Sequence, residues 1–307
     1  MARRCRVRRR SRRGATGDEA CERPGFVASL TPMIVESAPA KLNLALHVRA
    51  RRDDGYHELE TLFVFVRDGD TVRLTPAERD GFAIIGPFAA GLSGEGDNLV
   101  TRARDAFRAE FGPGDPLSLV LDKHLPVASG IGGGSADAAA TLRGMARLAD
   151  VALDDPRLMT LAAALGSDVP ACLAGRTMIG RGRGEQLSPI DVPQLPVLLV
   201  NPGVGVSTAA VFAAWDRSDR GPLPDGDALT IALQGRNDLE PPARALAPAI
   251  DTVLAMLGQA SGVLLARMSG SGATCFALFE RAADRTAAAT AIRAARPDWW
   301  CLETALA

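Results

Sequence analysis

The stretch that decides the fold is Pro126-Val-Ala-Ser-Gly-Ile-Gly-Gly-Gly-Ser-Ala-Asp-Ala-Ala-Ala140, which leads into a helical pattern that continues to Asp150. Its glycines are Gly130, Gly132, Gly133 and Gly134. Glycine permits positive φ and lets a ligand approach the backbone closely. The free N–H groups of a first helical turn, at the positive end of the helix dipole, form an anion site. We therefore predict a polyphosphate-binding loop; the alternative is a tight turn that binds no ligand.

Two familiar phosphate-binding loops do not fit this stretch. A P-loop needs a glycine directly before its lysine, but the chain has only Lys41 and Lys123, and neither follows a glycine. The dinucleotide fingerprint requires a third glycine where Ser135 stands, within a parallel βαβ unit. We expect the side chain of Ser135 or Asp137 to cap the helix after the glycines.

The composition indicates a globular chain with a substantial core and an acidic body. The 307 residues are 47% hydrophobic and suffice for one large or two ordinary domains. No apolar run is long enough to cross a membrane. The net charge is −1, but the first thirteen residues hold eight arginines and no acid, so the remainder carries about −9. This balance argues against nucleic acid and membranes as partners of the body.

The N-terminal residues and the cysteines bear on location. Residues 1–32 are unlike the rest, and we expect a poorly ordered extension upstream of a true start at Met33. A transit peptide or a nucleic-acid-binding arm are the alternatives. The five cysteines are widely spaced and form no Cys-x-x-Cys pair, so neither a zinc site nor a disulfide framework is predicted. A cytoplasmic location fits this pattern.

Hydrophobic periodicity predicts an α+β fold with two layered domains, 33–185 and 186–307. Expected strands cover 42–46, 60–66, 71–74, 81–85, 117–121, 196–200, 262–268 and 275–279. Expected helices cover 98–111 with Asp97 as cap, 135–150, 156–165, 207–215, 247–258 and 282–295. The segment 223–235 is expected to be irregular.

The first candidate site residues are Lys41, in Ala38-Pro-Ala-Lys-Leu-Asn-Leu44, and Lys123, just before the glycine loop. Arginine supplies every other strong positive charge of the chain. A lysine ammonium is a compact point charge with a tunable pKa, unlike a guanidinium. We interpret both lysines as functional; the alternative is that two lysines remain by chance.

Three further stretches carry candidate chemistry. Tyr56, the only tyrosine, and His57 follow a turn and can stack on a base and bind its edge; the alternative is a packed surface turn. Asp168, ahead of Pro170, can orient or deprotonate an attacking hydroxyl, or serve only as a turn residue. The small residues 269–274 either close over a phosphate or form a tight hairpin. His47 and His124 are interpreted as structural.

Together these stretches resemble the GHMP family of small-molecule kinases. Residues 38–46, 126–140 and 268–279 are similar to its three motifs, in the family's order. Residues 54–57, 166–170 and 236–240 resemble the members that act on a cytidine diphosphate-linked methylerythritol. The resemblance covers about residues 33–295. Ile131 and Ala136 depart from the usual leucine and second serine, but neither change removes a backbone donor.

The resemblance implies a ribosomal-S5-like N-terminal domain, a ferredoxin-like C-terminal domain and a site between them. It implies that ATP, with Mg²⁺, lies across the glycine loop, and it leaves the metal ligands open. The residues implied in ATP binding are Asn98, Lys123, Pro126, Gly130, Gly132, Gly133, Gly134 and Ser135. Asp168 would be the general base for a 2-hydroxyl, Lys41 would stabilise the developing charge, and Asn43, Tyr56 and His57 would hold the small-molecule substrate.

Three other hypotheses compete with this one. Another GHMP kinase, of the homoserine or mevalonate type, would not need the Tyr56-His57 pair. An S5-like module that binds RNA through its arginine arm is disfavoured by the acidic body and by the lone tyrosine. A GHMP-like regulator without activity would keep the fold and lose the chemistry.

Overall fold

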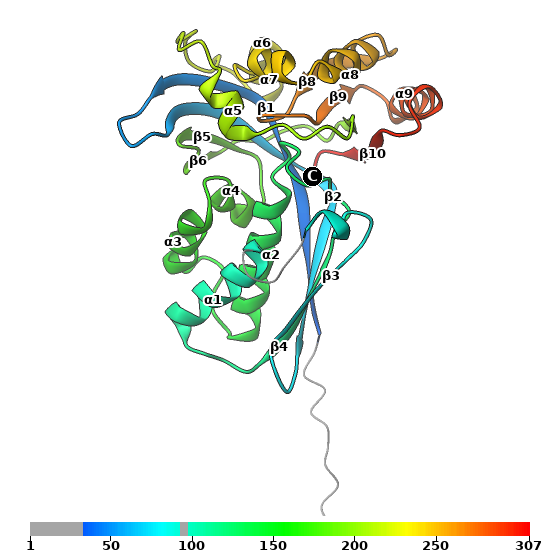
Figure 1. Cartoon of the computed structure of the whole chain (residues 1–307). Helices are drawn as coiled ribbons and strands as arrows, with labels where there is room; N and C mark the ends of the chain where they lie inside the picture. Colours follow the sequence, from blue (N-terminus) through cyan, green and yellow to red (C-terminus); the bar gives the residue numbers. More distant parts are fainter. Residues whose placement is uncertain (1–32, 93–97) are drawn as a thin grey trace, which may run out of the picture. The chain divides into compact units, whose positions relative to one another are not determined.

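A computed structural model of the chain describes residues 33–92 and 98–307 (Figure 1). The expected extension 1–32 and the expected cap Asp97 lie outside these residues. The strands are β1 Ile34–Arg51, β2 His57–Pro76, β3 Gly81–Ile85, β4 Leu117–Asp122, β5 Met178–Gly182, β6 Gln186–Pro189, β7 Pro196–Asn201, β8 Val263–Met268, β9 Cys275–Phe279 and β10 Trp300–Ala305. The helices are α1 Leu99–Phe111, α2 Gly133–Leu148, α3 Pro156–Leu165, α4 Val169–Ala174, α5 Thr208–Ala213, α6 Ala228–Gln234, α7 Glu240–Leu246, α8 Ala249–Gly258 and α9 Ala282–Ala295, with the 3-10 turn η1 at Ala89–Gly91.

The first sheet is built around the long antiparallel pair β1 and β2. Its order is β3-β4-β2-β5-β6, and β1 pairs with β2 along most of its length. The far end of β2 pairs with β4, and its beginning pairs with β5. Helices α1 to α4 gather beside this sheet, where α2 packs on β1 and β2 (Figure 1). Their apolar faces form one core with Phe63, Leu74 and Leu119.

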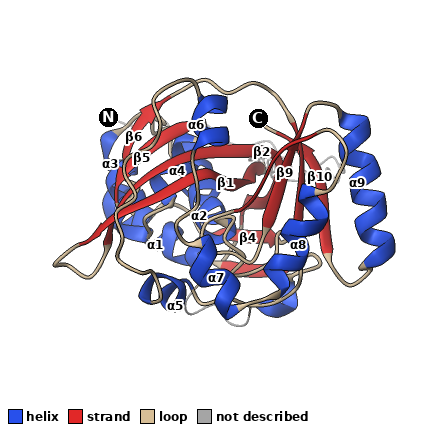
Figure 2. Cartoon of the chain, turned by 90° about the horizontal axis from the view of Figure 1, so that it is seen from above, coloured by secondary structure: helices blue, strands red, loops and turns tan. Residues whose placement is uncertain are grey.

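The second sheet is antiparallel, in the order β10-β7-β9-β8. Helices α8 and α9 pack on it, and Figure 2 shows both beside β9 and β10. A third apolar cluster joins the two sheets, with Leu44 and Val64 from the first and Leu199 and Phe276 from the second. The predicted α+β class is thus confirmed. None of the helices within 33–92 and 98–307 has the length and hydrophobicity required to span a bilayer.

Several expected elements are confirmed and others are wrong. Helix α9 has the expected bounds, and α1 begins one residue after Asn98, whose side chain caps it. The two strands expected at 60–66 and 71–74 are one strand, because Gly69 and Asp70 still pair with β1 after an irregularity between Pro39 and Lys41. The expected irregular segment 223–235 contains α6, which begins after the capping side chain of Asp227. Strand β10 was not expected.

The close approach of β2 to β1 near Pro39 requires a residue without a side chain on β2. Gly69 faces Pro39 across the pair, and a β-carbon at Gly69 would lie 2.1 Å from the carbonyl oxygen of Ala38. Because that atom belongs to the backbone, it cannot rotate away. We predict that Gly69→Ala lowers the free energy of unfolding by about 1 to 3 kcal/mol, measured by urea titration.

Gly81→Ala is the matched control, because nothing lies within 4 Å of a β-carbon at Gly81 in strand β3. Its free energy of unfolding should stay within about 0.5 kcal/mol of the parent. Equal losses for the two variants would show that close approach to β1 is not the reason for glycine at position 69.

Candidate active site

The glycine loop leads into α2 without a side-chain cap. Gly132 is the residue before the helix, with a left-handed φ of 67°, and no side chain bonds to the first turn. The expectation that Ser135 or Asp137 caps α2 is wrong, since both lie inside the helix. A β-carbon at Gly132 would lie 2.9 Å from Cε of Lys41, so glycine is needed here for space as well as for φ. The uncapped N–H groups of the first turn form a cradle suited to an anion.

The 269–274 segment supports this loop from behind. Ser269 Oγ donates to the carbonyl of Gly130 at 3.0 Å, and the N–H of Thr274 donates to the carbonyl of Ser129 at 3.1 Å. The N–H of Asn43 on β1 donates to Ser269 Oγ at 3.2 Å. The segment is therefore a hairpin connection between β8 and β9 that also fastens the glycine loop to β1.

Lys41 and Asp168, which are far apart in sequence, meet beside the glycine loop. Lys41 is 3% exposed, and its Nζ lies 2.9 Å from Oδ2 of Asp168 and donates to Oδ1 of Asn43 at 2.9 Å. The N–H of Lys41 donates to the carbonyl of Ile131 at 2.9 Å. Asn43 is oriented in turn by its amide, which donates to Thr61 Oγ1 at 2.8 Å.

Asp168 is directed by the start of a short helix. It precedes α4 and does not use its carboxylate as a cap, and Pro170 lies in the first turn. The Asp168 side chain is 34% exposed, unlike its buried partner Lys41. The carboxylate therefore has one oxygen at the ammonium group and remains open to a ligand.

Lys123 forms a second buried charge cluster. Its Nζ lies 2.5 Å from Asp70 Oδ2 and 2.7 Å from Asp137 Oδ2. The other oxygen of Asp70 accepts from the N–H groups of His124 and Leu125, which positions the chain entering the glycine loop. Sequence reasoning did not predict either carboxylate as a partner of Lys123, and it considered Asp137 only as a helix cap, because neither stands near Lys123 in a recognisable pattern.

Burial and charge oppose each other in this cluster. Burial lowers the pKa of Lys123, but the charges of Asp137 and Asp70 outweigh it and raise that pKa overall. Burial raises the pKa of Asp137 to about 7, although Lys123 opposes the rise. Oδ1 of Asp137 is buried and has no hydrogen-bond partner among residues 33–92 and 98–307.

Aromatic side chains gather at another part of the site. His57 stacks on Phe212 with ring centroids 4.7 Å apart and meets the edge of Trp215 at 5.8 Å. Tyr56 is 51% exposed, and Arg183 lies over its ring. Phe212 in α5 and Trp215 just after that helix were missed because no local motif surrounds them. The available signal was two aromatics in a chain with 5% aromatic residues.

One cavity of about 1130 Å³ connects these parts. The cavity is lined by every residue that the sequence analysis assigned to the site, namely Lys41, Asn43, Tyr56, His57, Asn98, Lys123, Pro126, Gly130, Gly132, Gly133, Gly134, Ser135 and Asp168. The fold thus brings together residues that are spread over much of the chain.

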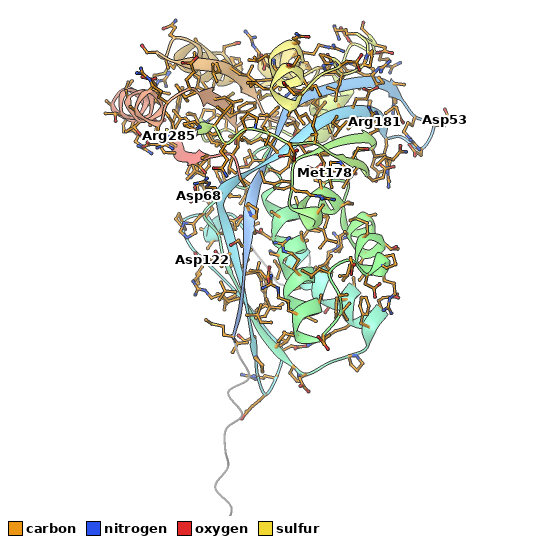
Figure 3. The ribbon with its side chains drawn as sticks, turned by 180° about the vertical axis from the view of Figure 1, so that it is seen from behind. Asp53, Asp68, Asp122, Met178, Arg181 and Arg285 are labelled. Atoms are coloured by element: carbon orange, nitrogen blue, oxygen red, sulfur yellow. The ribbon has the colours of Figure 1, made fainter. Side chains whose placement is uncertain are left out.

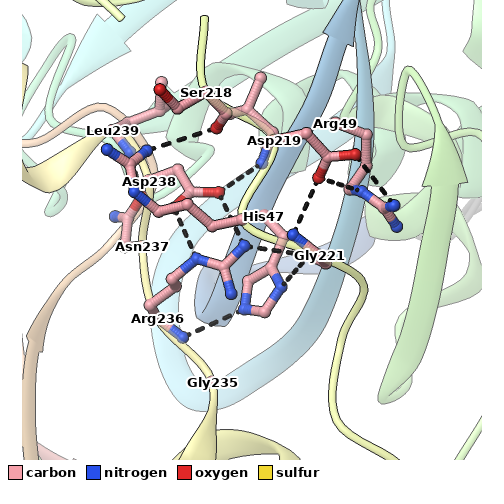
Figure 4. Close-up of polar contacts among 12 residues, drawn as sticks. His47, Arg49, Ser218, Asp219, Gly221, Gly235, Arg236, Asn237, Asp238 and Leu239 are labelled. Atoms are coloured by element: carbon pink, nitrogen blue, oxygen red, sulfur yellow. Dashed lines mark hydrogen bonds and ion pairs between the residues drawn. The ribbon is translucent and has the colours of Figure 1, made fainter. Parts of the chain in front are cut away.

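His47 lies in a polar cluster with Gly221 and Arg236 (Figure 4). Its Nε2 accepts from the N–H of Arg236, so Nδ1 carries the proton and donates to the carbonyls of Gly221 and Pro222. Burial lowers the pKa of His47, with the charge of Arg236 acting in the same direction. Asp238 accepts from Arg236 and from the N–H of Val48, which secures the same segment to β1.

Comparison with known proteins identifies the family. The sequence profile of the GHMP kinase N-terminal domain matches residues 98–176, and that of the GHMP kinase C-terminal domain matches 225–298. A relative from Rhizorhabdus wittichii, named 4-diphosphocytidyl-2-C-methyl-D-erythritol kinase, is 55% identical over 88% of this chain and 94% of its own length. The chain belongs to the GHMP kinase family. A relative of the same name from Mesorhizobium japonicum is 49% identical over 87% of this chain and 94% of its own length.

Solved structures agree with this assignment. A crystal structure of 4-(cytidine 5'-diphospho)-2C-methyl-D-erythritol kinase is 35% identical, with a TM-score of 0.74 over 89% of this chain and all of that one. Homoserine kinase from Cytophaga hutchinsonii shares the fold, with 19% identity and a TM-score of 0.66 over 92% of this chain and 96% of that one. The two-domain GHMP kinase fold implied by the sequence is confirmed.

The raised pKa of Asp137 predicts a pH effect on stability. The folded chain holds this proton more tightly than the unfolded chain, in which an aspartate has a pKa of about 4. The contribution of Asp137 to the free energy of unfolding is therefore complete below about pH 4 and falls as the pH rises to about 7. Asp137→Asn removes this titration.

The difference in unfolding free energy, parent minus Asp137→Asn, should thus decrease between about pH 4 and 7 and level off above that range. Urea unfolding at a series of pH values measures it. A difference that is constant, or that grows with pH, would contradict the placement of Asp137 among desolvated charges.

Proposed function

We propose that this chain transfers the terminal phosphoryl group of ATP to the 2-hydroxyl of 4-diphosphocytidyl-2-C-methyl-D-erythritol, in the cytoplasm. The observation that carries the proposal is the Lys41–Asp168 pair, 2.9 Å apart beside the uncapped start of α2, in a cavity that also holds Tyr56 and His57. The relatives bearing that enzyme name support the substrate. The free thiols of Cys172, Cys275 and Cys301 support the location.

The reacting groups have distinct tasks in this proposal. The open oxygen of Asp168 orients the acceptor hydroxyl and takes its proton as the new P–O bond forms. The Lys41 ammonium neutralises charge that develops on the transferring group, and Asn43 keeps that ammonium in place. Most of the rate enhancement would come from positioning and charge neutralisation, as is general for phosphoryl transfer.

The glycine loop fits a triphosphate, and the residues next to it fit Mg²⁺. The N–H groups of Gly133, Gly134 and Ser135 have no side-chain cap to displace. Asp137 has a buried carboxylate oxygen without a partner, and Ser135 provides a hydroxyl in the same cavity. Mg²⁺ is commonly held by one or two protein oxygens together with substrate phosphates. When bound, the metal would neutralise phosphate charge.

The aromatic cluster supports recognition of a nucleoside. Tyr56, His57 and Phe212 offer ring faces and an imidazole edge to a base. The division into 33–185 and 186–307 stays a prediction; the two family profiles match within these halves, at 98–176 and 225–298.

The general-base role is tested by Asp168→Asn. The amide keeps the size and much of the polarity of the carboxylate but cannot accept the proton, so kcat should fall by about 10²- to 10⁴-fold. The KM for ATP should change little, because the glycine loop is intact. A coupled assay of ADP release measures both constants.

Asp154→Asn serves as the control, because Asp154 is exposed at the turn before α3 and does not line the cavity. Its kcat should equal that of the parent. If Asp168→Asn keeps the parental turnover, Asp168 is not the base.

Substrate choice is tested with a panel of alcohols in the same assay. The cytidyl-linked alcohol should exceed methylerythritol without its cytidyl group by at least about 100-fold in kcat/KM, because the latter leaves the aromatic cluster unused. Homoserine and mevalonate complete the panel. Comparable turnover of the cytidyl-linked and cytidyl-free alcohols would remove the basis of the proposal, and preference for homoserine or mevalonate would replace it with another GHMP kinase activity.

A further inference from the structure

Three arginines line the cavity around the aromatic cluster: Arg51, Arg183 and Arg217. Within residues 33–92 and 98–307, none of their guanidinium groups forms an ion pair. The charge of Arg183 does act on Asp54, whose pKa is lowered first by the N–H of Tyr56 and further by that charge. Arginines close to them in sequence do form such pairs, as Arg49 does with Asp219 and Arg52 does with Glu58. Unpaired cations on the wall of a cavity favour an anionic ligand.

Arg51 and Arg183 lie close to the Tyr56-His57 pair. Arg51 is the β1 residue directly opposite His57 in the antiparallel register. The pKa of His57 is lowered first by burial and then by the charge of Arg51, which confirms that the two groups are near each other. The guanidinium carbon of Arg183 lies 4.9 Å from the centre of the Tyr56 ring.

Arg217 reaches the cavity from the loop after α5. It follows Trp215, which meets the edge of His57, by two residues. Its φ of 63° lies in the left-handed region, which is uncommon for a residue with a side chain and is a reason to suspect function.

The turn around Arg217 is held by its own charges. Asp216 accepts from the N–H of Ser218 and pairs with Arg220, while Asp219 pairs with Arg49. The carboxylates of this turn are therefore occupied, and the guanidinium of Arg217 is left for a ligand in the cavity.

We propose that Arg51, Arg183 and Arg217 bind the diphosphate that joins the nucleoside to the acceptor alcohol, and so select a nucleoside diphosphate over a nucleoside. This inference rests on the proposed function and assigns the charged part of its substrate. Guanidinium groups donate charge-assisted hydrogen bonds to phosphate in a planar fork. The phosphates of ATP have a separate set of donors in the glycine loop and Lys41.

The test compares cytidine diphosphate with cytidine, by calorimetric titration of the full chain. The parent should bind the diphosphate at least about tenfold more tightly at low salt, and added salt should reduce that preference. Arg183→Met and Arg217→Met should each reduce the preference by about three- to tenfold. Arg183→Lys should retain part of it.

Arg181→Met is the matched control. Arg181 is exposed on β5, two residues before Arg183, which follows the end of that strand, and Arg181 does not line the cavity. Figure 3 labels it on β5, with Asp53 at the tip of the β1–β2 hairpin. This variant should keep the full preference for the diphosphate.

The remaining outcomes separate the two proposals. If the parent binds neither ligand, the proposed function fails. If the parent prefers the diphosphate and Arg183→Met and Arg217→Met keep that preference, the assignment of the arginines is overturned while the proposed function stands. Weaker binding of ATP in these variants, with an unchanged preference for cytidine diphosphate, would likewise overturn it.

Discussion

A buried ammonium group requires a partner of opposite charge, and in this structure that need holds the site together. Lys41 is 3% exposed and pairs with Asp168, while Oδ1 of Asn43 accepts a hydrogen bond from the same ammonium group. Removing one member of such a pair leaves an uncompensated charge, which is far more costly than the net worth of the pair. Strand β1, the start of α4 and the glycine loop are therefore held in one arrangement.

Close approach of backbone segments is the second constraint. Gly132 lets the Lys41 side chain pass directly beside the loop, and Ser269 fastens Gly130 and Asn43 to the β8–β9 hairpin. Side chains of one motif thus restrain the backbone of another. A site built from such contacts is pre-organised, so little reorganisation is needed when charge develops on a ligand.

Sequence reasoning found the parts of the site that are local. The glycine-rich turn before a helix, the rare lysines and the Tyr56-His57 pair are visible in short stretches. It failed where a local signal is shared by several structures: Ser135 can cap a helix, but α2 starts earlier because Gly132 adopts the left-handed conformation. It also failed for Asp70, Phe212 and Trp215, whose roles depend on neighbours distant in the chain.

The sequence by itself determined the α+β class, the GHMP kinase motifs and the candidate residues for phosphate binding and proton transfer. These follow from periodicity, from side-chain chemistry and from the special conformations of glycine, all of which act within a few residues. The tertiary structure alone decided that Lys41 meets Asp168, that Lys123 lies between Asp70 and Asp137, and that α5 closes on His57. Such contacts join segments up to some 150 residues apart, and they form because burying apolar surface between the two sheets brings those segments together.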